Sequence, residues 1–258
     1  MSTVTGDLSW GERWQRSWDH QQEGYMPDRE LRLGALVDLV EAVSGPAPRV
    51  LDLACGTGSI TRRLLDRLPQ ARVVGVDIDP ALLVIAEATV GADERVRIVR
   101  ADLRAPTWVE VLGAAEPGPF DAVVTATALH WLPEAALRRL YRDLHGLVRP
   151  GALVANADDM TTGGLPRVAE ALAALEDRRR AATYADGRPT WDGWWDIVAD
   201  DPALAPAVDE RRHYFRGNHA PSFVPPAEWH VAALAAAGFV ESGVAWRAGT
   251  GAIVAAVR

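Results

Sequence analysis

The chain has 258 residues, a formal net charge of −8, no lysine and a single cysteine. This length suffices for one large α/β domain, while the acidic balance disfavours nucleic acid, which requires clustered basic side chains to neutralise its phosphates. One cysteine excludes internal disulfides and multi-cysteine metal sites, and the absence of lysine excludes a Schiff base to a cofactor and a Walker-type nucleotide site.

Residues 1–48 are predicted to form an N-terminal helical cap. Three tryptophans recur every four residues and share one face of a helix over about residues 7–22, namely Trp10, Trp14 and Trp18. A second apolar helical pattern follows and ends in a run of glycine and proline. The tryptophans either anchor the cap by packing, or Trp18 covers a ligand together with His20 and Tyr25. This stretch lacks the apolar run of a signal peptide, which predicts a cytoplasmic protein without a membrane partner.

Strands and helices are then predicted to alternate. The expected strands are 49–54, 73–76, 96–100, 120–125 and 152–157. Helical segments lie between them, one of them opened by Asp79 as the N-cap before Pro80. This alternation implies a parallel sheet with helices on both faces. A helix over 227–237 and two strands follow, and the short connection between these strands requires antiparallel pairing.

The chain between the fifth strand and this last helix interrupts the pattern. It is polar, divided by prolines and rich in tryptophan, with one clear helix over residues 166–182. We therefore expect 159–226 to be an insertion or lid on the substrate side. The main domain is predicted to consist of residues 49–158 and 227–258.

A glycine loop joins the first strand to the first helix of that domain. Gly56 and Gly58 flank one residue directly after the apolar strand, and a helical segment begins at residue 59. Glycine lets a ligand approach the main chain, and the helix N-terminus adds favourable dipoles. Two glycines alone are also compatible with a tight turn that binds nothing.

Three aspartates narrow the choice of ligand. Asp77 ends the second strand, where a carboxylate can accept both ribose hydroxyls of an adenosine. Asp102 ends the third strand, where it can accept the exocyclic amine of adenine. Asp52 lies just before the glycine loop, where it suits an ammonium group and would repel a pyrophosphate.

This order of motifs resembles the class I S-adenosylmethionine-dependent methyltransferases. The matching segments are residues 51–58, 74–77, 101–103, 120–124 and 147–153. The resemblance implies a Rossmann-like, doubly wound α/β fold. Its seven-stranded sheet is mostly parallel, has an antiparallel C-terminal strand and carries helices on both faces, in agreement with the hairpin expected here. It also implies S-adenosylmethionine as the cofactor and S-adenosylhomocysteine as its product.

The resemblance implies a role for several positions. Asp52 would hold the methionine ammonium, directly or through water, and Asp77 would bind the ribose. The remaining positions expected to contact the cofactor are Ala54, Gly56, Gly58, Ile78, Asp102, Leu103 and Ala126 on the sheet side, and Trp18 and Tyr25 on the cap.

Candidates for the chemistry follow the fourth strand, because ligands gather at the carboxyl edge of such sheets. His130 is the candidate catalytic residue, as a general base or as a hydrogen-bond donor to the substrate. It can equally be a residue that bonds the main chain near the cofactor. Trp131, next to it, is expected to form a wall of the pocket or to be part of the core.

Aromatic residues of the insertion are the candidates for binding the substrate. They are Trp191, Trp194, Trp195, His213, Tyr214 and His219. An aromatic cavity with a few polar groups is the usual form of a small-molecule site. The same residues can instead form a small core for the insertion itself. The six histidines show no short spacing typical of a metal site, so we expect no metal.

The sequence therefore predicts a methyltransferase that uses S-adenosylmethionine on the oxygen, nitrogen or carbon of a small molecule, with secondary metabolism as one setting. Two alternatives remain open: a nicotinamide-dependent oxidoreductase, and a protein that binds S-adenosylmethionine without transferring a methyl group. Asp77 suits the oxidoreductase, but Asp52 and Thr61 do not. We expect a monomer or homodimer that binds no nucleic acid.

Overall fold

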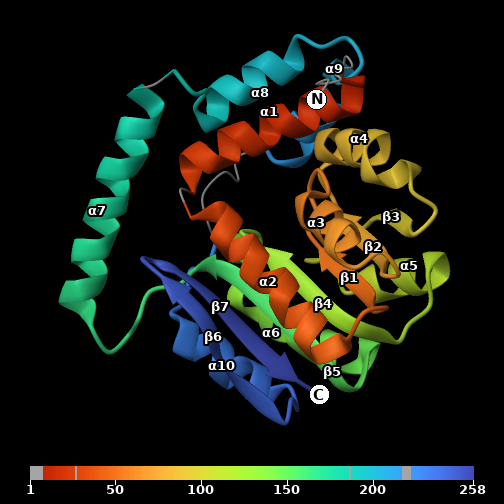
Figure 1. Cartoon of the computed structure of the whole chain (residues 1–258), viewed down its shortest axis with the longest axis vertical. Helices are drawn as coiled ribbons and strands as arrows, with labels where there is room; N and C mark the ends of the chain where they lie inside the picture. Colours follow the sequence, from red (N-terminus) through yellow and green to blue (C-terminus); the bar gives the residue numbers. More distant parts are fainter. Residues whose placement is uncertain (1–7, 27, 186, 217–221) are drawn as a thin grey trace, which may run out of the picture.

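The computed structural model describes residues 8–26, 28–185, 187–216 and 222–258. These residues contain a seven-stranded sheet in the order β3-β2-β1-β4-β5-β7-β6 (Figure 1). Only β7 runs antiparallel to its neighbours β5 and β6, whereas the pairs from β3 to β5 are parallel. The strands are β1 (Arg49–Leu53), β2 (Arg72–Asp77), β3 (Val96–Arg100), β4 (Phe120–Ala126), β5 (Val148–Asp159), β6 (Glu241–Ala248) and β7 (Gly251–Val257).

Helices cover both faces of this sheet because its strands are apolar on both sides. Alternate side chains of a strand point to opposite faces. Leu51 accordingly belongs to one hydrophobic cluster with residues of α5 (Trp108–Ala115), α6 (Glu134–Leu147) and α10 (Ala227–Ala236), whereas Val50 belongs to another with residues of α2 (Arg29–Ser44) and α3 (Ser59–Arg67). The fold class predicted from the sequence is confirmed.

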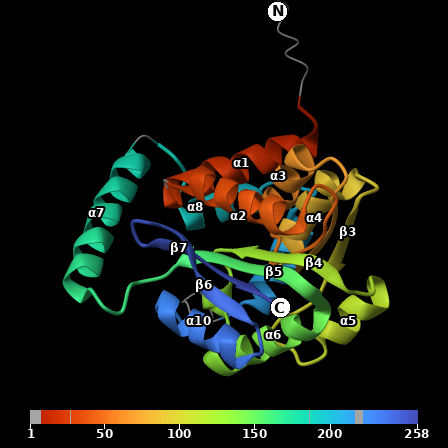
Figure 2. The same ribbon diagram turned by 60° about the horizontal axis from the view of Figure 1, so that its bottom comes forward.

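The cap and part of the insertion share a further hydrophobic cluster, which is smaller than those on the two faces of the sheet. It joins α1 (Trp10–Tyr25), α4 (Pro80–Ala88), α8 (Trp191–Ala199) and α9 (Ala205–Tyr214). Trp18 and Trp194 meet at a centroid distance of 4.9 Å, and Nε1 of Trp194 donates to Oγ of Ser17. Figure 2 shows α1 and α8 on the same side of the molecule. The tryptophan repeat therefore packs against the insertion, and Trp18 also belongs to the lining of the cavity described below.

The insertion contains more helix than its sequence predicted. One helix was expected over 166–182, but the structure has α7 (Pro166–Ala185), α8 and α9. Figures 1 and 2 both show α7 standing apart from the body, and none of its residues is buried. Its contacts with the rest of the protein include hydrogen bonds from Arg180 to the carbonyl oxygen of Tyr25 and from the backbone N–H and the hydroxyl of Thr250 to Glu176.

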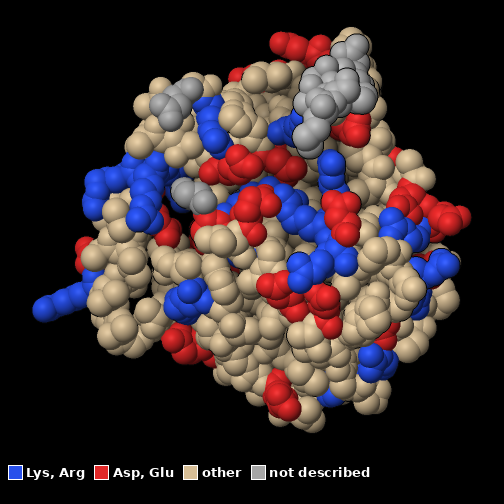
Figure 3. Space-filling model, viewed as in Figure 1, with Lys and Arg blue, Asp and Glu red and all other residues tan. Residues whose placement is uncertain are grey.

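Two further features bear on the surface of the protein. None of the helices in the described ranges is both long and apolar enough to span a bilayer. On the face shown in Figure 3, acidic and basic side chains are interspersed. Short helical turns follow two of these elements: η1 (Val90–Ala92) comes after α4, and η2 (Leu129–Trp131) comes after β4.

Candidate functional site

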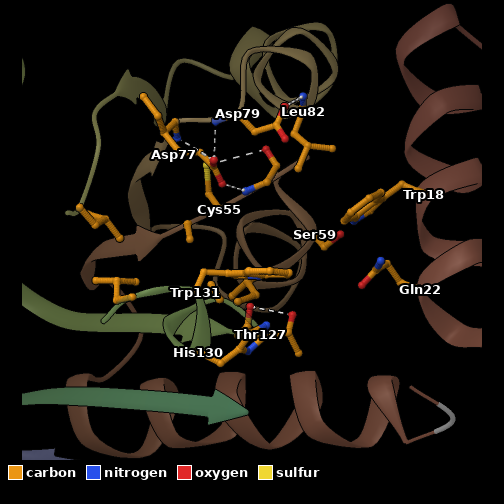
Figure 4. Close-up of a pocket in the computed structure, with 18 of the residues that line it drawn as sticks. Trp18, Gln22, Cys55, Ser59, Asp77, Asp79, Leu82, Thr127, His130 and Trp131 are labelled. Atoms are coloured by element: carbon orange, nitrogen blue, oxygen red, sulfur yellow. Dashed lines mark hydrogen bonds between the residues drawn. The ribbon is translucent and has the colours of Figure 1, made fainter. Parts of the chain in front are cut away.

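A cavity of about 420 Å³ opens at the carboxyl edge of the parallel strands. Its floor is formed by the segments that follow β1, β2, β3 and β4, and α1, α2, α8 and α9 contribute to its walls. Figure 4 shows Asp77 and Cys55 at one end, His130 and Thr127 at the other, and Trp18 and Gln22 on the side of α1. This volume lies within the range of small-molecule sites.

The glycine loop brings main chain to the cavity surface. Gly56, with φ +56°, lines the cavity, and a Cβ built on it would come no closer than 3.7 Å to any neighbouring residue. Ala54 lines the cavity too, with φ +53°. Gly58 does not line it: it begins α3 at φ +85°, where a Cβ would lie 2.6 Å from Cγ2 of Val90. Gly58 therefore has a structural role: at the start of α3, it allows the loop to pack closely against Val90.

Asp77 stands at the end of β2 and faces both the loop and the cavity. Its Oδ2 accepts from the backbone N–H of Gly56 at 2.7 Å, and its Oδ1 accepts from those of Ile78 at 2.6 Å and Asp79 at 2.8 Å. Burial raises the pKa of Asp77 to about 6, although these N–H groups oppose the shift. Both Asp77 and Ile78 line the cavity.

Asp52 lies beneath the loop and does not line the cavity. Its side chain is fully buried, and its Oδ2 accepts from the backbone N–H of Thr61 at 3.1 Å and from its hydroxyl at 2.7 Å. Oδ1 has no partner among the described residues. Burial raises the pKa of Asp52 to about 7. The structure thus does not bring Asp52 to the cavity wall, because its strand position directs the side chain toward α3.

Asp102 lines the cavity after β3 together with Leu103. Its Oδ1 accepts from Nε and the backbone N–H of Arg104, and Tyr214 of α9 donates its hydroxyl to Oδ2 at 2.5 Å. Partial burial would raise the pKa of Asp102, but the bonds from Arg104 and Tyr214 outweigh it and lower the pKa. The insertion therefore contacts the residue predicted to bind adenine.

His130 lies in η2 and lines the cavity at the end away from Asp77. Both carboxylate oxygens of Asp158 lie 2.9 Å from its Nδ1. Burial would lower the pKa of His130, but the charge and hydrogen bond of Asp158 outweigh it and raise the pKa. Trp131 lines the same cavity with 38% of its surface exposed, and Ala126 lines it at the end of β4.

The aromatic residues of the insertion separate into different places. Trp191 lines the cavity, as do Trp18 and Tyr25 of the cap. Trp194 and Trp195 do not line it, because they pack into the core of α1, α4, α8 and α9, where the guanidinium of Arg211 lies 3.6 Å from the ring centroid of Trp195. Two other candidates are also outside the lining: His213 is exposed on α9, and Tyr214 contacts Asp102. His219 lies outside the described residues.

Several polar residues of the cavity were not predicted. Arg29 and Arg32 of α2 are buried and line it, and Nη2 of Arg29 donates to Oγ of Ser59 at 2.8 Å. Asp79, foreseen only as a helix cap, also accepts from Nε of Arg211 at 2.6 Å. Among the described residues, no three histidine, cysteine or acidic side chains come together as a metal site would need.

Comparison with known proteins agrees with this architecture. Residues 50–151 match a family model described as a methyltransferase domain. Over 140 residues the chain is 36% identical to a trans-aconitate 2-methyltransferase of Azoarcus sp. (strain BH72), in an alignment that covers 54% of this chain and 49% of that protein. The chain spans about half the length of the first curated relatives it matches.

Solved structures show the same fold. An O-methyltransferase family protein from Burkholderia thailandensis has a TM-score of 0.55 at 20% identity, covering 86% of this chain and 55% of that one. A magnesium protoporphyrin IX methyltransferase from Synechocystis PCC 6803, solved with bound S-adenosylhomocysteine, has a TM-score of 0.53 at 16% identity, covering 96% and 93%. Together with the family match, these findings confirm the class I S-adenosylmethionine-dependent methyltransferase domain recognised from the sequence.

Proposed function

We propose that this chain transfers a methyl group from S-adenosylmethionine to a small-molecule acceptor bound in the cavity. The observation that carries the proposal is the convergence of three strand ends: the main chain of Gly56 after β1, Asp77 at the end of β2 and Asp102 after β3 all line one cavity. That order matches the amino-acid, ribose and adenine parts of the cofactor, as the sequence resemblance implied.

The residues present fit this cofactor. The main chain of Gly56 lines the cavity and carries no side chain, so an amino-acid segment can lie against the loop. Asp77 supplies an ionised acceptor for ribose hydroxyls above its pKa of about 6. Leu103 supplies an apolar surface beside Asp102 for the adenine. Asp52, buried below the loop, can act on the ammonium only through the loop or an intervening water.

The nicotinamide alternative fits the same residues less well. In a nicotinamide fingerprint the position of Thr61 is usually glycine or alanine, which allows close helix packing. Here the Thr61 hydroxyl is committed to Asp52. Asp52, the residue expected to repel a pyrophosphate, is buried below the loop and does not line the cavity, so Thr61 carries the argument against this alternative.

Calorimetry tests the proposal with S-adenosylhomocysteine and NAD as competing ligands for the whole chain. We expect binding of S-adenosylhomocysteine and none of NAD. Binding of NAD alone would favour the oxidoreductase. Binding of S-adenosylmethionine without transfer of its labelled methyl group to any metabolite pool would favour a protein that binds the cofactor without methylating.

The acceptor itself is a further part of the proposal. Several curated relatives are named trans-aconitate 2-methyltransferase, so trans-aconitate is the first acceptor to test, followed by small molecules of secondary metabolism. We also propose that residues 1–48 and 159–226 act as cap and lid over this cavity, since Trp18, Tyr25, Trp191 and Arg211 contribute to its walls.

A further inference from the structure

Four arginines contribute to the cavity lining, and Arg32 differs from the other three. In the others the guanidinium lies within 3.0 Å of a carboxylate: Arg29 of Asp19, Arg104 of Asp102 and Arg211 of Asp79. Arg32 also has carboxylate partners, Asp28 at 3.2 Å and Asp159 at 3.0 Å, but both bond a single nitrogen, Nη2. Its Nε and Nη1 are buried and have no partner among the described residues.

The unused nitrogens of Arg32 belong to a charged group that is almost fully enclosed. Its side chain is 3% exposed. Burial would lower the pKa of Arg32, but the charges of Asp159 and Asp28 outweigh it and raise the pKa, so the guanidinium stays charged. A buried N–H group without an acceptor is unfavourable, most of all on a charged group. A carboxylate in the cavity would supply the missing acceptor, and guanidinium is the side-chain group best suited to bind one.

Gly251 leaves the space in which this guanidinium lies. It is the first residue of β7 and pairs with Asp159 in the register of β5 and β7. A Cβ built on Gly251 would lie 2.2 Å from Nη2, 2.7 Å from Cζ and 3.1 Å from Nε of Arg32. The backbone of Gly251 does not have a positive φ, so room for Arg32, and not an unusual backbone conformation, accounts for a glycine here.

Arg32 lies on the side of the cavity that is left for the acceptor. Its partner Asp159 follows Asp158, whose carboxylate oxygens lie 2.9 Å from Nδ1 of His130. The residues proposed to bind ribose and adenine belong to β2 and β3, and β1 and β4 separate these strands from β5. Arg29, one helical turn before Arg32, instead bonds Ser59 directly after the glycine loop.

The neighbouring part of the lining is apolar or aromatic. Tyr25 ends α1, Met26 follows it, and Leu33 is next to Arg32 on α2; all three line the cavity. A charged group beside apolar walls suits a small organic molecule with one anionic end and an apolar body.

The carboxylates that already bond Arg32 leave its charge available to a ligand. Neither Asp28 nor Asp159 lines the cavity. Their side chains are 26% and 37% exposed, so water screens their charges more than that of Arg32. Because these two negative charges remain nearby, a singly charged carboxylate fits the position better than a doubly charged phosphate ester.

On the basis of the proposed function, we propose that Arg32 determines the acceptor class by binding a carboxylate of the acceptor through Nε or Nη1. The acceptor is accordingly a carboxylate-bearing small molecule. For any such acceptor that is methylated, Arg32→Met should raise KM more than it lowers kcat, because the anchor binds the acceptor and does not take part in methyl transfer.

Calorimetry on the whole chain saturated with S-adenosylhomocysteine tests the acceptor class with simple probes. Benzoate should bind, and benzamide, its uncharged counterpart of the same shape, should bind at least about tenfold more weakly. Benzoate should also shift the Nε–H resonance of Arg32 in the NMR spectrum, assigned by its loss in Arg32→Met. No binding of benzoate, equal binding of benzamide, or tighter binding of phenyl phosphate would overturn the proposal.

Two pairs of variants test whether Arg32 is the residue responsible. Arg32→Met should weaken benzoate binding at least about tenfold, whereas Arg67→Met should not, because Arg67 is 56% exposed on α3 and does not line the cavity. Gly251→Ala keeps every charge but displaces the guanidinium, and should also weaken benzoate binding. Gly243→Ala on β6 is its control, since nothing lies within 4 Å of the added Cβ. Unchanged benzoate binding in both Arg32→Met and Gly251→Ala would contradict the proposal.

Asp159→Asn separates this role from a purely structural one. Removing a negative charge beside Arg32 should strengthen benzoate binding. If Arg32 only joined α2 to β5, the variant would lose stability and bind benzoate as the wild type does, which would overturn the proposal. Weaker binding of S-adenosylhomocysteine by Arg32→Met would also overturn it, because Arg32 would then bind the cofactor. Absence of S-adenosylhomocysteine binding by the wild type would instead reject the proposed function.

Discussion

Replacing Asp77 with asparagine should weaken cofactor binding more than it weakens the fold. In the wild type, three backbone N–H groups converge on the two carboxylate oxygens. An amide offers one oxygen and turns an NH₂ group toward donors. With Asp77 as the proposed ribose ligand, the ribose hydroxyls would lose a charged acceptor, and the backbone N–H of Gly56 would lose its carboxylate partner.

The expected size follows from the chemistry of a charged hydrogen bond. Loss of such an acceptor costs about 1.5–3 kcal/mol. At about 1.4 kcal/mol per tenfold change, this corresponds to a dissociation constant for S-adenosylhomocysteine that is roughly 10- to 150-fold higher. Calorimetry on protein shown to be folded by circular dichroism measures it. Asp38→Asn is the matched control, because its side chain is 67% exposed on α2 and does not line the cavity.

The same carboxylate predicts the pH dependence of binding. Its pKa of about 6 means that Asp77 is ionised at pH 8 and becomes protonated as the pH falls through 6. Affinity of the wild type for S-adenosylhomocysteine should therefore fall below pH 6, and the Asp77→Asn variant should lose this component. If the variant binds within twofold of the wild type at pH 8, Asp77 is not the ribose ligand and the reasoning fails.

Three further outcomes are expected. Gly58→Ala should lower the free energy of unfolding by at least about 1–2 kcal/mol, since φ is +85° and the new Cβ would meet Val90. Gly34→Ala is the control and should not lower it, because the space around Gly34 is open. Equal urea midpoints for the two variants would contradict this prediction. Thr61→Val should cost about 1–3 kcal/mol by removing a donor to buried Asp52, and Thr61→Ser should restore most of it; a neutral Thr61→Val would refute the bond's importance. Burial raises the pKa of Asp52 to about 7, so the folded carboxyl binds its proton more tightly than the unfolded one. Its contribution to stability should therefore increase as pH falls from 8 to 5 and vanish in Asp52→Asn, and urea titrations in which wild type and variant depend on pH alike would exclude it.

The sheet was predictable because its signals are local. Each buried strand is a short apolar run, and the connection between β6 and β7 is too short for a parallel crossover. The recognition of Gly56, Asp77 and Asp102 as one site followed from their places at strand ends, and all three line the cavity. That these three residues bind a ligand remains a prediction.

The insertion was less predictable because its helices depend on distant partners. Helix α8 buries Trp194 against Trp18, which lies 176 positions earlier in the chain. No local sequence pattern in a polar stretch divided by prolines predicts such a contact. The same applies to Asp52, whose partner Thr61 was noted only as a departure from a glycine pattern.

The pairing of His130 with Asp158 illustrates the same limit. The two residues are 28 positions apart, and Asp158 followed by Asp159 looks like the start of a loop. They meet because Ala126 and Ala157 pair in the register of β4 and β5, which places Asp158, near the end of β5, beside the segment that follows β4. The register between two strands is a property of the folded sheet, and a single sequence does not predict it.

The central claim, that this cavity holds the methyl donor, is tested most directly by a crystal structure of the whole chain with S-adenosylhomocysteine. We expect the adenosine between Asp77 and Asp102, with both ribose hydroxyls on the Asp77 carboxylate, and the sulfur toward the side of the cavity that His130 lines. The ligand bound elsewhere, or its ribose turned away from Asp77, would contradict the account.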